Sequence, residues 1–204
     1  MADLVIRPAT EDESDVIADL VFGEPGQETR RVAAALYGVN DPARLRPLFR
    51  ALWRAGQNWK HTFVGVADGA IVDIVQCGSS AMRVTPSVAV IALRALGLRV
   101  LAAPKAMRLH DRVSPTKPPD AMVISELHVL STARGKGIGG RLLAFAEHEA
   151  ARRGLTRVAL HTYVTNPARH LYERNGYVAE TVATDAAFER RTGVPGNVLF
   201  VKDL

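Results

Sequence analysis

Hydrophobic residues recur along the chain with two periods, and the change between them predicts an order of strands and helices. Residues 4–7 fit a short strand closed by Pro8. Thr10 and Glu13 have the capping-box spacing, which predicts a helix through about Phe22. Helical spacing over 26–37 and 43–55 predicts two more helices. We therefore expect the chain to open with one strand and three helices.

The next segment combines a hairpin with a helical insertion. Two β-rich runs surround Asp68-Gly69, a dipeptide that supplies the positive φ angles of a tight hairpin turn. The pattern over 85–113 is helical and basic, and the proline-rich stretch SPTKPPD after it predicts a loop. We expect a helical insertion between strands at about residues 79–120.

Strands and helices alternate in the rest of the chain. Strands are predicted at 121–130 and 157–164, helices at 139–153 and 167–174, and two final strands at 177–183 and 197–202. The stretch between the final strands, 184–196, is expected to be a loop. Strict alternation divides the strand 121–130 into two faces: Met122, Ile124, Glu126 and His128 on one, and Val123, Ser125, Leu127 and Val129 on the other.

Composition indicates an ordinary globular protein. The 204 residues, 48% hydrophobic and 23% charged, suit one domain over residues 1–204. Cys77 is the single cysteine, so neither an intrachain disulfide nor a thiolate zinc cluster can form, and we expect no metal. The stretch MADLVIRPATEDESD lacks the basic start and long apolar core of a secretory signal. These features favour the cytoplasm.

The net charge of +5 allows a phosphate-rich ligand, a nucleic acid or an anionic membrane as partner. Because the basic residues are scattered along the chain, they indicate a solvated surface, and we expect no nucleic-acid partner. Arg94 and Arg99 interrupt the most apolar segment, which argues against a membrane span. The helix expected at 88–112 then covers the sheet or forms a homodimer contact, and contact with a membrane surface is the less favoured alternative.

Four glycines lie between a predicted strand and a predicted helix in ARGKGIGGRLL, residues 133–143. Three of them fit the G-x-G-x-x-G spacing of dinucleotide-binding folds, but no acidic residue follows at the distance that a ribose contact needs. A Walker loop is excluded because Arg141 follows Gly140. The favoured interpretation is an anion site at a helix N-terminus, where glycines let a phosphate approach free N–H groups. The alternative is a turn that only packs helix against strand.

Two motifs, in the expected order, resemble the GNAT superfamily of acyl-CoA-dependent N-acyltransferases. RGKGIG fits its R/Q-x-x-G-x-G/A signature, with Arg134, Gly137 and Gly139 at the defined positions. ARHLYERNGY resembles its second motif, A-x-x-L-Y-E-x-x-G-F/Y. The specific resemblance covers about residues 121–183, and the opening VIRPATEDE and the predicted hairpin agree with it weakly.

The resemblance implies an α/β (α+β) fold with a mixed, twisted central sheet and flanking helices. It implies that the fourth and fifth strands splay apart and hold the pantetheine arm of acetyl-CoA, the cosubstrate, while its pyrophosphate lies on the N–H groups of residues 134–140. The residues expected to bind the cosubstrate are Leu127, His128, Val129, Arg134, Gly135, Lys136, Gly137, Ile138, Gly139, Gly140, Asn166 and Tyr172.

The sequence departs from the family pattern at one position. The superfamily often has Asn three residues before the alanine of the second motif; here that position is Thr165, and Asn166 follows it. Either side chain can hydrogen-bond the pantetheine arm or the strand end. Asn166-Pro167 also suits a helix start, because Asn is a good N-cap and Pro fits the first turn.

Acyl transfer from a thioester to an amine needs a neutral amine, stabilisation of the carbonyl oxygen and a proton for the departing thiolate. Glu126, a carboxylate among apolar strand residues, is the candidate general base, acting through water; a structural ion pair with an arginine is the alternative. His128 can share this role. In the superfamily that the motifs resemble, the tyrosine at the position of Tyr172 commonly serves as general acid near the sulfur. The backbone N–H of Val129 is expected to meet the oxyanion.

The sequence therefore predicts an N-acetyltransferase, and the resemblance implies direct attack in a ternary complex. The acceptor is expected to be a small-molecule amine or a peptide amine, and the basic surface favours an anionic or neutral one. A catalytically idle module of the same fold, binding acyl-CoA as a sensor or docking domain, is the alternative. Retention of Glu126 and Tyr172 counts against it.

Overall fold

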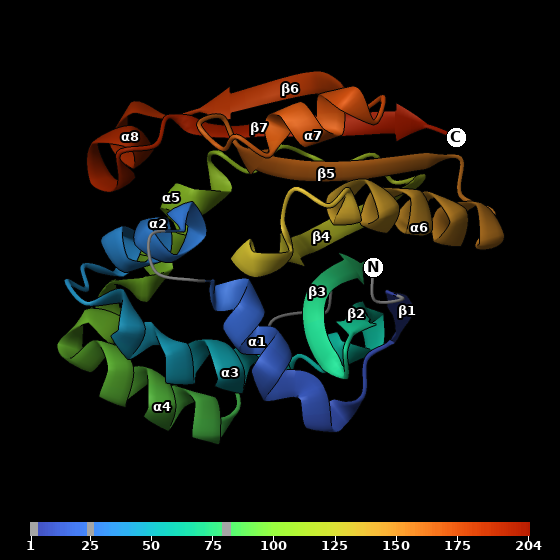
Figure 1. The fold of residues 1–204 in the computed structure, drawn as a ribbon. Coiled ribbons are helices and arrows are strands. Elements are labelled where there is room, and N and C mark those ends of the chain that lie inside the picture. The colour runs from blue at the N-terminus through green and yellow to red at the C-terminus, as the bar shows by residue number, and fades with distance from the viewer. Residues whose placement is uncertain (1–3, 24–26, 79–82) are drawn as a thin grey trace.

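The computed structural model describes residues 4–23, 27–78 and 83–204, and its strands form one twisted sheet. The strands are β1 (Val5–Pro8), β2 (Thr62–Ala67), β3 (Ala70–Cys77), β4 (Ala121–Val129), β5 (Arg157–Tyr163), β6 (Val178–Thr184) and β7 (Gly196–Asp203). Their order across the sheet is β1-β2-β3-β4-β5-β7-β6. The β4–β5 pairing is parallel and the five other pairings are antiparallel. Figure 1 shows the β1–β3 half twisted away from the β5–β7 half.

The helices of the described residues flank this sheet. They are α1 (Ser14–Phe22), α2 (Glu28–Tyr37), α3 (Arg46–Ala55), α4 (Pro86–Leu96), α5 (Ala103–Asp111), α6 (Ile138–Arg152), α7 (Arg169–Arg174) and α8 (Ala186–Thr192), with short 3-10 turns η1 (Glu11–Glu13), η2 (Pro42–Leu45), η3 (Asn58–His61), η4 (Gly97–Ala102) and η5 (Ser131–Ala133). The predicted mixed, twisted sheet with flanking helices is confirmed.

Local signals in the sequence explain the first elements. The Thr10 N–H donates to Glu13 Oε2 at 2.8 Å, so the predicted capping box forms and starts the helical stretch η1–α1. Asp68 and Gly69 have φ angles of 51° and 77°, which close the predicted hairpin between β2 and β3. The helix expected at 26–37 is α2, which begins at Glu28; Gly26 lies outside the described residues.

The expected loop 184–196 is wrong, because α8 lies within it. The Asp185 carboxylate accepts from the N–H groups of Ala187 and Phe188, both at 2.8 Å, and so caps the helix. Gly193, with φ of 76°, ends it, and the fully buried Phe188 anchors it. The sequence contains both capping residues, Asp185 and Gly193, but the helix between them is too short for its hydrophobic pattern to predict it.

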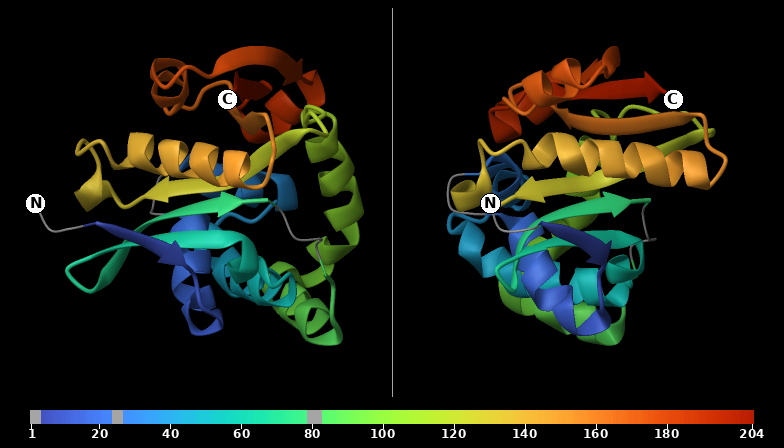
Figure 2. Two further views of the ribbon diagram at one scale, coloured as in Figure 1. Left: turned by 90° about the vertical axis from the view of Figure 1, so that its right-hand side faces the viewer. Right: turned by 45° about the vertical axis from the view of Figure 1, so that its right-hand side comes forward.

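The helical insertion between β3 and β4 is broken into three parts. Gly97, with φ of 58°, ends α4, and η4 separates it from α5. Figure 2 shows this green segment along one side of the molecule. By length and composition alone, the run Pro86–Asp111 is apolar enough to cross a membrane, and 17% of its apolar window is buried. Val88, Ala95 and Leu96 are the buried residues of this run that pack into a core with α1 to α3. The first residues of the expected insertion, 79–82, lie outside the described residues.

The fourth and fifth strands splay apart, as the resemblance implied. β4 pairs with β5 over Ala121–Ile124, opposite Arg157–Leu160, and the pairing then stops. Beyond this point β4 stays paired with β3, and β5 stays paired with β7. The ends of the two strands therefore diverge and open the sheet at their C-terminal ends.

A β-bulge lies where the splay begins. On β3, Gln76 pairs with Glu126 and Cys77 pairs with Ile124, so Ser125 is an extra residue on β4. The bulge changes the face of the sheet on which the following side chains lie. The sequence prediction that Glu126 shares a face with Met122 and Ile124 is therefore wrong.

Two different cores cover the two faces of β4. The first, beneath α6 and α7, contains Met122 and Ile124 before the bulge and contacts Leu127 and Val129 after it. His128 pairs with Ile74, which belongs to the core beneath α1 and α3 on the opposite face. Glu126 and His128 thus share the α1–α3 face, and the prediction that these two residues lie together is confirmed.

Candidate active site

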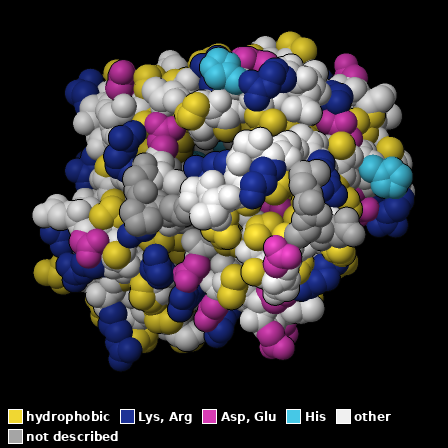
Figure 3. Space-filling model, in the orientation of Figure 1, with side chains coloured by type: hydrophobic (Ala, Val, Ile, Leu, Met, Phe, Trp, Pro, Cys, Tyr) yellow, Lys and Arg dark blue, Asp and Glu magenta, His cyan; other side chains and the backbone are white. Residues whose placement is uncertain are grey.

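A cavity of about 1100 Å³ lies at the splay and extends to the glycine turn. Figure 3 shows a hollow in this region of the surface. Its wall includes most of the residues that the sequence assigned to a cosubstrate site: Leu127, His128, Val129, Arg134, Gly135, Gly137, Ile138, Gly139, Gly140, Asn166 and Tyr172. Lys136 is exposed and lies outside this wall, as does Glu126, which reaches the cavity only through His128. The motifs are thus brought together around one space.

The glycine turn leaves amides available at the start of α6. Gly137 is the N-cap, with φ of 75°, and Gly135 has the same φ, so both residues occupy the left-handed region that favours glycine. The first intrahelical hydrogen bond runs from the Arg141 N–H to the Gly137 carbonyl at 3.2 Å. The N–H groups of residues 138–140 precede that bond, and a glycine N-cap offers them no side-chain acceptor. An anion in the cavity can accept from them, helped by the helix dipole.

Gly139 and Gly140 have a different role from the first two glycines. A Cβ on Gly139 would lie 2.7 Å from Leu171 Cδ2, and one on Gly140 would lie 3.3 Å from Asn175 Oδ1. These positions let α6 approach the α7 region closely. These two glycines thus also serve packing, and because both line the cavity, the expectation that they keep the helix start open for a diphosphate stays a prediction. Among the described residues, Cβ atoms at Gly135 and Gly137 would meet nothing within 4 Å.

Glu126 and His128 form a hydrogen-bonded pair on β4. The distance from His128 Nε2 to Glu126 Oε2 is 3.0 Å, and both side chains are partly buried. The bulge at Ser125 lets both residues lie on the face that turns toward α1 and α3. The partner of the Glu126 carboxylate is therefore the His128 imidazole. Among the described residues, Glu126 forms no ion pair with an arginine, which was the alternative.

The Val129 amide points into the splay. The next amide, that of Leu130, donates to the Val72 carbonyl on the β3 side at 2.9 Å. Successive amides of a strand point to opposite sides, so the Val129 N–H and C=O point toward β5, where the β4–β5 pairing has already ended. Arg134 Nε donates to this carbonyl at 3.0 Å and holds the mouth of the splay.

Tyr172 lies on the other side of the cavity, in the core beneath α6 and α7. It is 7% exposed, and its ring packs against Phe200 at 5.6 Å and Tyr177 at 6.4 Å between centroids. Burial, with a smaller contribution from the negative charge of Glu126, raises the pKa of Tyr172 to about 12. The phenol therefore keeps its proton.

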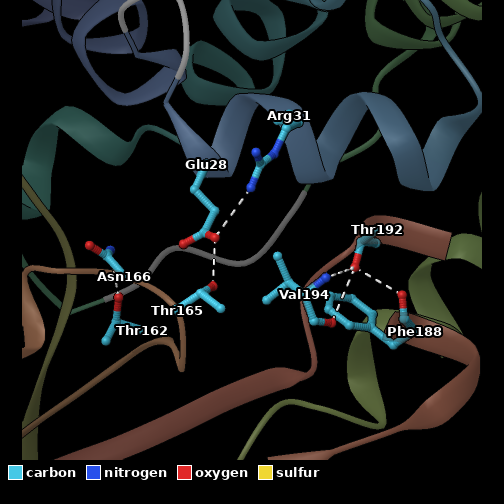
Figure 4. A network of polar contacts seen from close by, with 8 residues as sticks. All are labelled: Glu28, Arg31, Thr162, Thr165, Asn166, Phe188, Thr192 and Val194. Carbon is cyan, nitrogen blue, oxygen red and sulfur yellow. Dashed lines mark hydrogen bonds and ion pairs between the residues drawn. The ribbon is translucent and has the colours of Figure 1, made fainter. Parts of the chain in front are cut away.

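The residues at the end of β5 hold the wall next to α7. Asn166 Nδ2 donates to Thr162 Oγ1 at 2.8 Å, and its Oδ1 accepts from the Ala168 N–H at 2.9 Å, so this side chain shapes the turn into α7. Thr165 Oγ1 donates to Glu28 Oε1 at 2.6 Å (Figure 4). The helix-start interpretation of Asn166 thus describes its contacts, and α7 begins at Arg169, two residues later than predicted.

Part of the wall was missed in the sequence. Gln27, Glu28 and Thr29, at the N-terminus of α2, line the cavity opposite the α7 region. The hydrophobic pattern predicted α2 but carried no signal that its first turn lies beside residues more than a hundred positions later. Ser131, Thr165, Pro167, Ala168, Leu171 and Arg174 complete the wall.

A second hollow, of about 570 Å³, lies between α3 and α4 and contains none of the predicted site residues. Its arginines are already paired with carboxylates of α1: Arg54 with Asp15 at 2.8 Å, and Arg50 with Asp19 through two hydrogen bonds. The larger cavity is therefore the candidate active site.

Comparisons with known proteins agree with this geometry. The model of the family described as "Acetyltransferase (GNAT) family" matches residues 37–177. The uncharacterized N-acetyltransferase YhfO of Bacillus subtilis (strain 168) is 43% identical over 60 residues, which are 29% of this chain. The match spans 40% of that relative's own length.

Solved structures show the same fold at low identity. The PaiA N-acetyltransferase of Thermoplasma acidophilum, in complex with coenzyme A, superposes with a TM-score of 0.58 at 12% identity over 99% of each chain. The polyamine N-acetyltransferase of Drosophila melanogaster, described as forming N-acetylagmatine, gives 0.58 at 16% identity over 99% of this chain and all of its own. Because the family model matches well over half of the 204 residues, the chain belongs to the GNAT acetyltransferase family.

Proposed function

We propose that this protein transfers the acetyl group of acetyl-CoA to a primary amine by direct attack in a ternary complex. One observation carries the proposal: a single cavity joins the open amides of the glycine turn to a splay that has Tyr172 on one side and the Glu126–His128 pair on the other. The relatives named above are N-acetyltransferases, which supports an amine as acceptor.

The cosubstrate would lie along the α6–α7 side of this cavity. Its pyrophosphate would accept from the N–H groups of residues 138–140, next to Arg134 and Arg174. Its pantetheine arm would run between the diverging ends of β4 and β5, where the Val129 N–H has no strand partner on the β5 side. This amide would also donate to the carbonyl oxygen as negative charge develops there.

The acceptor would approach from the α1–α3 side. Glu126, oriented by His128, would take a proton from the ammonium or the attacking amine through water. The amine nitrogen bonds to the thioester carbonyl carbon, and the C–S bond breaks with its electron pair on sulfur. Tyr172 donates a hydrogen bond to this sulfur and keeps its own proton, and the thiolate takes up the proton that water received from the amine.

Proximity is the main contribution of Tyr172. Its pKa of about 12 exceeds that of an ordinary thiol by several units, so full transfer to a free thiolate is unfavourable. A phenol held in the cavity can instead stabilise the charge on the leaving sulfur as that charge forms.

Release of free thiol from acetyl-CoA in the presence of a panel of amines tests the proposal, with mass spectrometry of the acetylated products. We expect turnover with at least one primary amine and an acetyl amide as product. If coenzyme A stabilises the protein thermally but no amine in the panel, small molecule or peptide, is acetylated, the protein is an acyl-CoA-binding module instead.

A further inference from the structure

Glu28 is a carboxylate in the cavity wall that neither motif contains. It is the first residue of α2, its side chain is 18% exposed, and it lies beside Thr165 at the end of β5. Among the described residues, one of its two carboxylate oxygens has hydrogen-bond partners. Oε1 accepts from Thr165 at 2.6 Å and lies 3.5 Å from Arg31 Nη2 (Figure 4).

The second oxygen, Oε2, is buried and has no hydrogen-bond partner among the residues that the structure describes. Figure 4 shows it on the side of Glu28 that faces Asn166, another residue of the cavity wall. A buried carboxylate oxygen without a donor is costly, so a donor from a ligand in the cavity would stabilise it.

The cavity has opposite charges at its two ends. The glycine turn lies beside the middle and the C-terminal end of the α7 segment, through Gly139 near Leu171 and Gly140 near Asn175. Glu28 contacts Thr165, before the N-terminus of the same helix. The open amides of the glycine turn and the Glu28 carboxylate thus lie beside different parts of the α7 segment.

Glu28 and Glu126 act on the same part of the sheet. Both carboxylates, together with burial as the largest cause, raise the pKa of Tyr163 on β5. Glu28 reaches this strand from α2, and Glu126 reaches it from β4. Two carboxylates thus act on the part of β5 next to the splay, although Lys117 also lies near enough to β5 to lower the pKa of His161, and the protein as a whole carries a net charge of +5.

We propose that Glu28 determines specificity by binding a second, positively charged group of the acceptor, so that the preferred substrates are aliphatic diamines or other amines with a distal cation. The inference rests on the proposed acetyl transfer. The amine that attacks must be neutral, whereas the distal ammonium stays charged and donates to Glu28 Oε2. This reverses the preference for an anionic or neutral acceptor that the basic surface suggested, because the cavity wall and not the whole surface contacts the substrate.

A comparison of three acceptors of similar length tests this proposal: putrescine with a distal cation, butylamine with none, and γ-aminobutyrate with a distal anion. We expect kcat/KM for acetylation to decrease in that order. Loss of one charge-assisted hydrogen bond in Glu28→Gln should reduce the putrescine-to-butylamine preference by about 10- to 100-fold, mainly through KM for putrescine. Equal rates for the three acceptors, or an unchanged preference in the variant, would overturn the proposal.

Two variants separate recognition from a structural clasp between α2 and the β5 end. Glu28→Gln keeps an oxygen that accepts from Thr165, whereas Thr165→Val removes the clasp and keeps the carboxylate. If Glu28 recognises the acceptor, only Glu28→Gln should lose the preference for putrescine. If the Thr165–Glu28 hydrogen bond only holds α2 against the end of β5, only Thr165→Val should lose this preference.

Calorimetric titration of putrescine into the protein with coenzyme A bound makes the inference testable apart from turnover. Binding that Glu28→Gln weakens supports the role of Glu28 even if acetylation is absent, in which case the proposed function alone fails. No putrescine binding to either protein would overturn the inference alone if other amines are acetylated.

Discussion

Oε2 of Glu126 lies 3.0 Å from Nε2 of His128, and both residues follow the bulge at Ser125. This pairing makes a direct prediction for Glu126→Gln, a substitution that keeps the size of the side chain and a hydrogen-bonding atom for His128. Loss of the proton acceptor should lower kcat/KM by about 10²- to 10⁴-fold. Thiol release measures the rate, and circular dichroism checks that the fold is retained.

Glu173→Gln is the matched control for this substitution. Glu173 also pairs with an imidazole, that of His170, at 3.2 Å, but on the exposed surface of α7 and outside the cavity wall. Its loss should leave kcat/KM within a few-fold of the wild-type value. Equal losses in the two variants would show that a carboxylate–imidazole pair matters only for folding.

Two buried tyrosines allow a similar test of the acid. Tyr172 and Tyr177 pack edge to face at 6.4 Å, but only Tyr172 lines the cavity. Tyr172→Phe should lower kcat by about 10²-fold or more, with little change in coenzyme A affinity, whereas Tyr177→Phe should keep kcat near wild type. Since burial raises the pKa of Tyr172 to about 12, an alkaline fall in wild-type activity near pH 8 or 9 is not its deprotonation. A Tyr172→Phe enzyme with normal kcat would remove this residue from the mechanism.

The sequence predicted the parts of the site that local spacing defines. The glycines of the turn and Tyr172 lie at fixed offsets within short motifs, and all line the cavity. The sequence correctly placed the Glu126 side chain on the same face of β4 as His128, but wrongly on the same face as Ile124. An extra residue such as Ser125 is defined by pairing with β3, about fifty residues earlier, and strict alternation contains no sign of it.

Contacts between distant segments account for what the sequence did not reveal. Glu28 and Thr165 are 137 positions apart, and each belongs to an element that was predicted, yet no periodicity places one beside the other. The packing role of Gly139 likewise depends on Leu171, whose helix was predicted without its position relative to α6. Helices and strands can thus be predicted from short stretches of sequence. A cavity wall that two distant elements form together can be recognised only once the fold is known.

Gly137 tests the glycine turn as an anion site. Gly137→Ala places a residue with a Cβ at φ of 75°, which should reduce stability by roughly 1–2 kcal/mol. Its methyl group would enter the turn where the diphosphate is expected, so the Kd for coenzyme A should rise by about tenfold or more. Gly193→Ala is the control, because Gly193 has φ of 76°, equally open surroundings and a position outside the cavity wall. Both should lower Tm alike, and weaker binding in both, or in neither, would contradict the assignment.

Asp73 predicts an unusual dependence of stability on pH. It is fully buried on β3, between Gly65 on β2 and Val129 on β4, and a Cβ at Gly65 would lie 2.1 Å from its carboxylate. Burial raises the pKa of Asp73 to about 6, and the positive charge of Arg141 opposes this effect only in part. The unfolded chain ionises Asp73 near its ordinary pKa of about 4.

The sign follows from these two pKa values. Well below about pH 4 both states hold the proton, and ionisation of Asp73 has no effect on stability; between about pH 4 and 6 the unfolded chain has lost this proton while the folded state still holds it, so about 3 kcal/mol of stability is lost across this range and stays lost above it. Asp73→Asn should therefore be more stable than wild type at about pH 8, by up to that amount, and the difference should shrink toward about pH 4. Urea unfolding of both proteins across this range measures the difference, with Asp68→Asn on the exposed hairpin as control. A variant that is less stable than wild type at about pH 8 would mean that the ionised carboxylate is stabilised where it lies, with Arg141 outweighing the effect of burial.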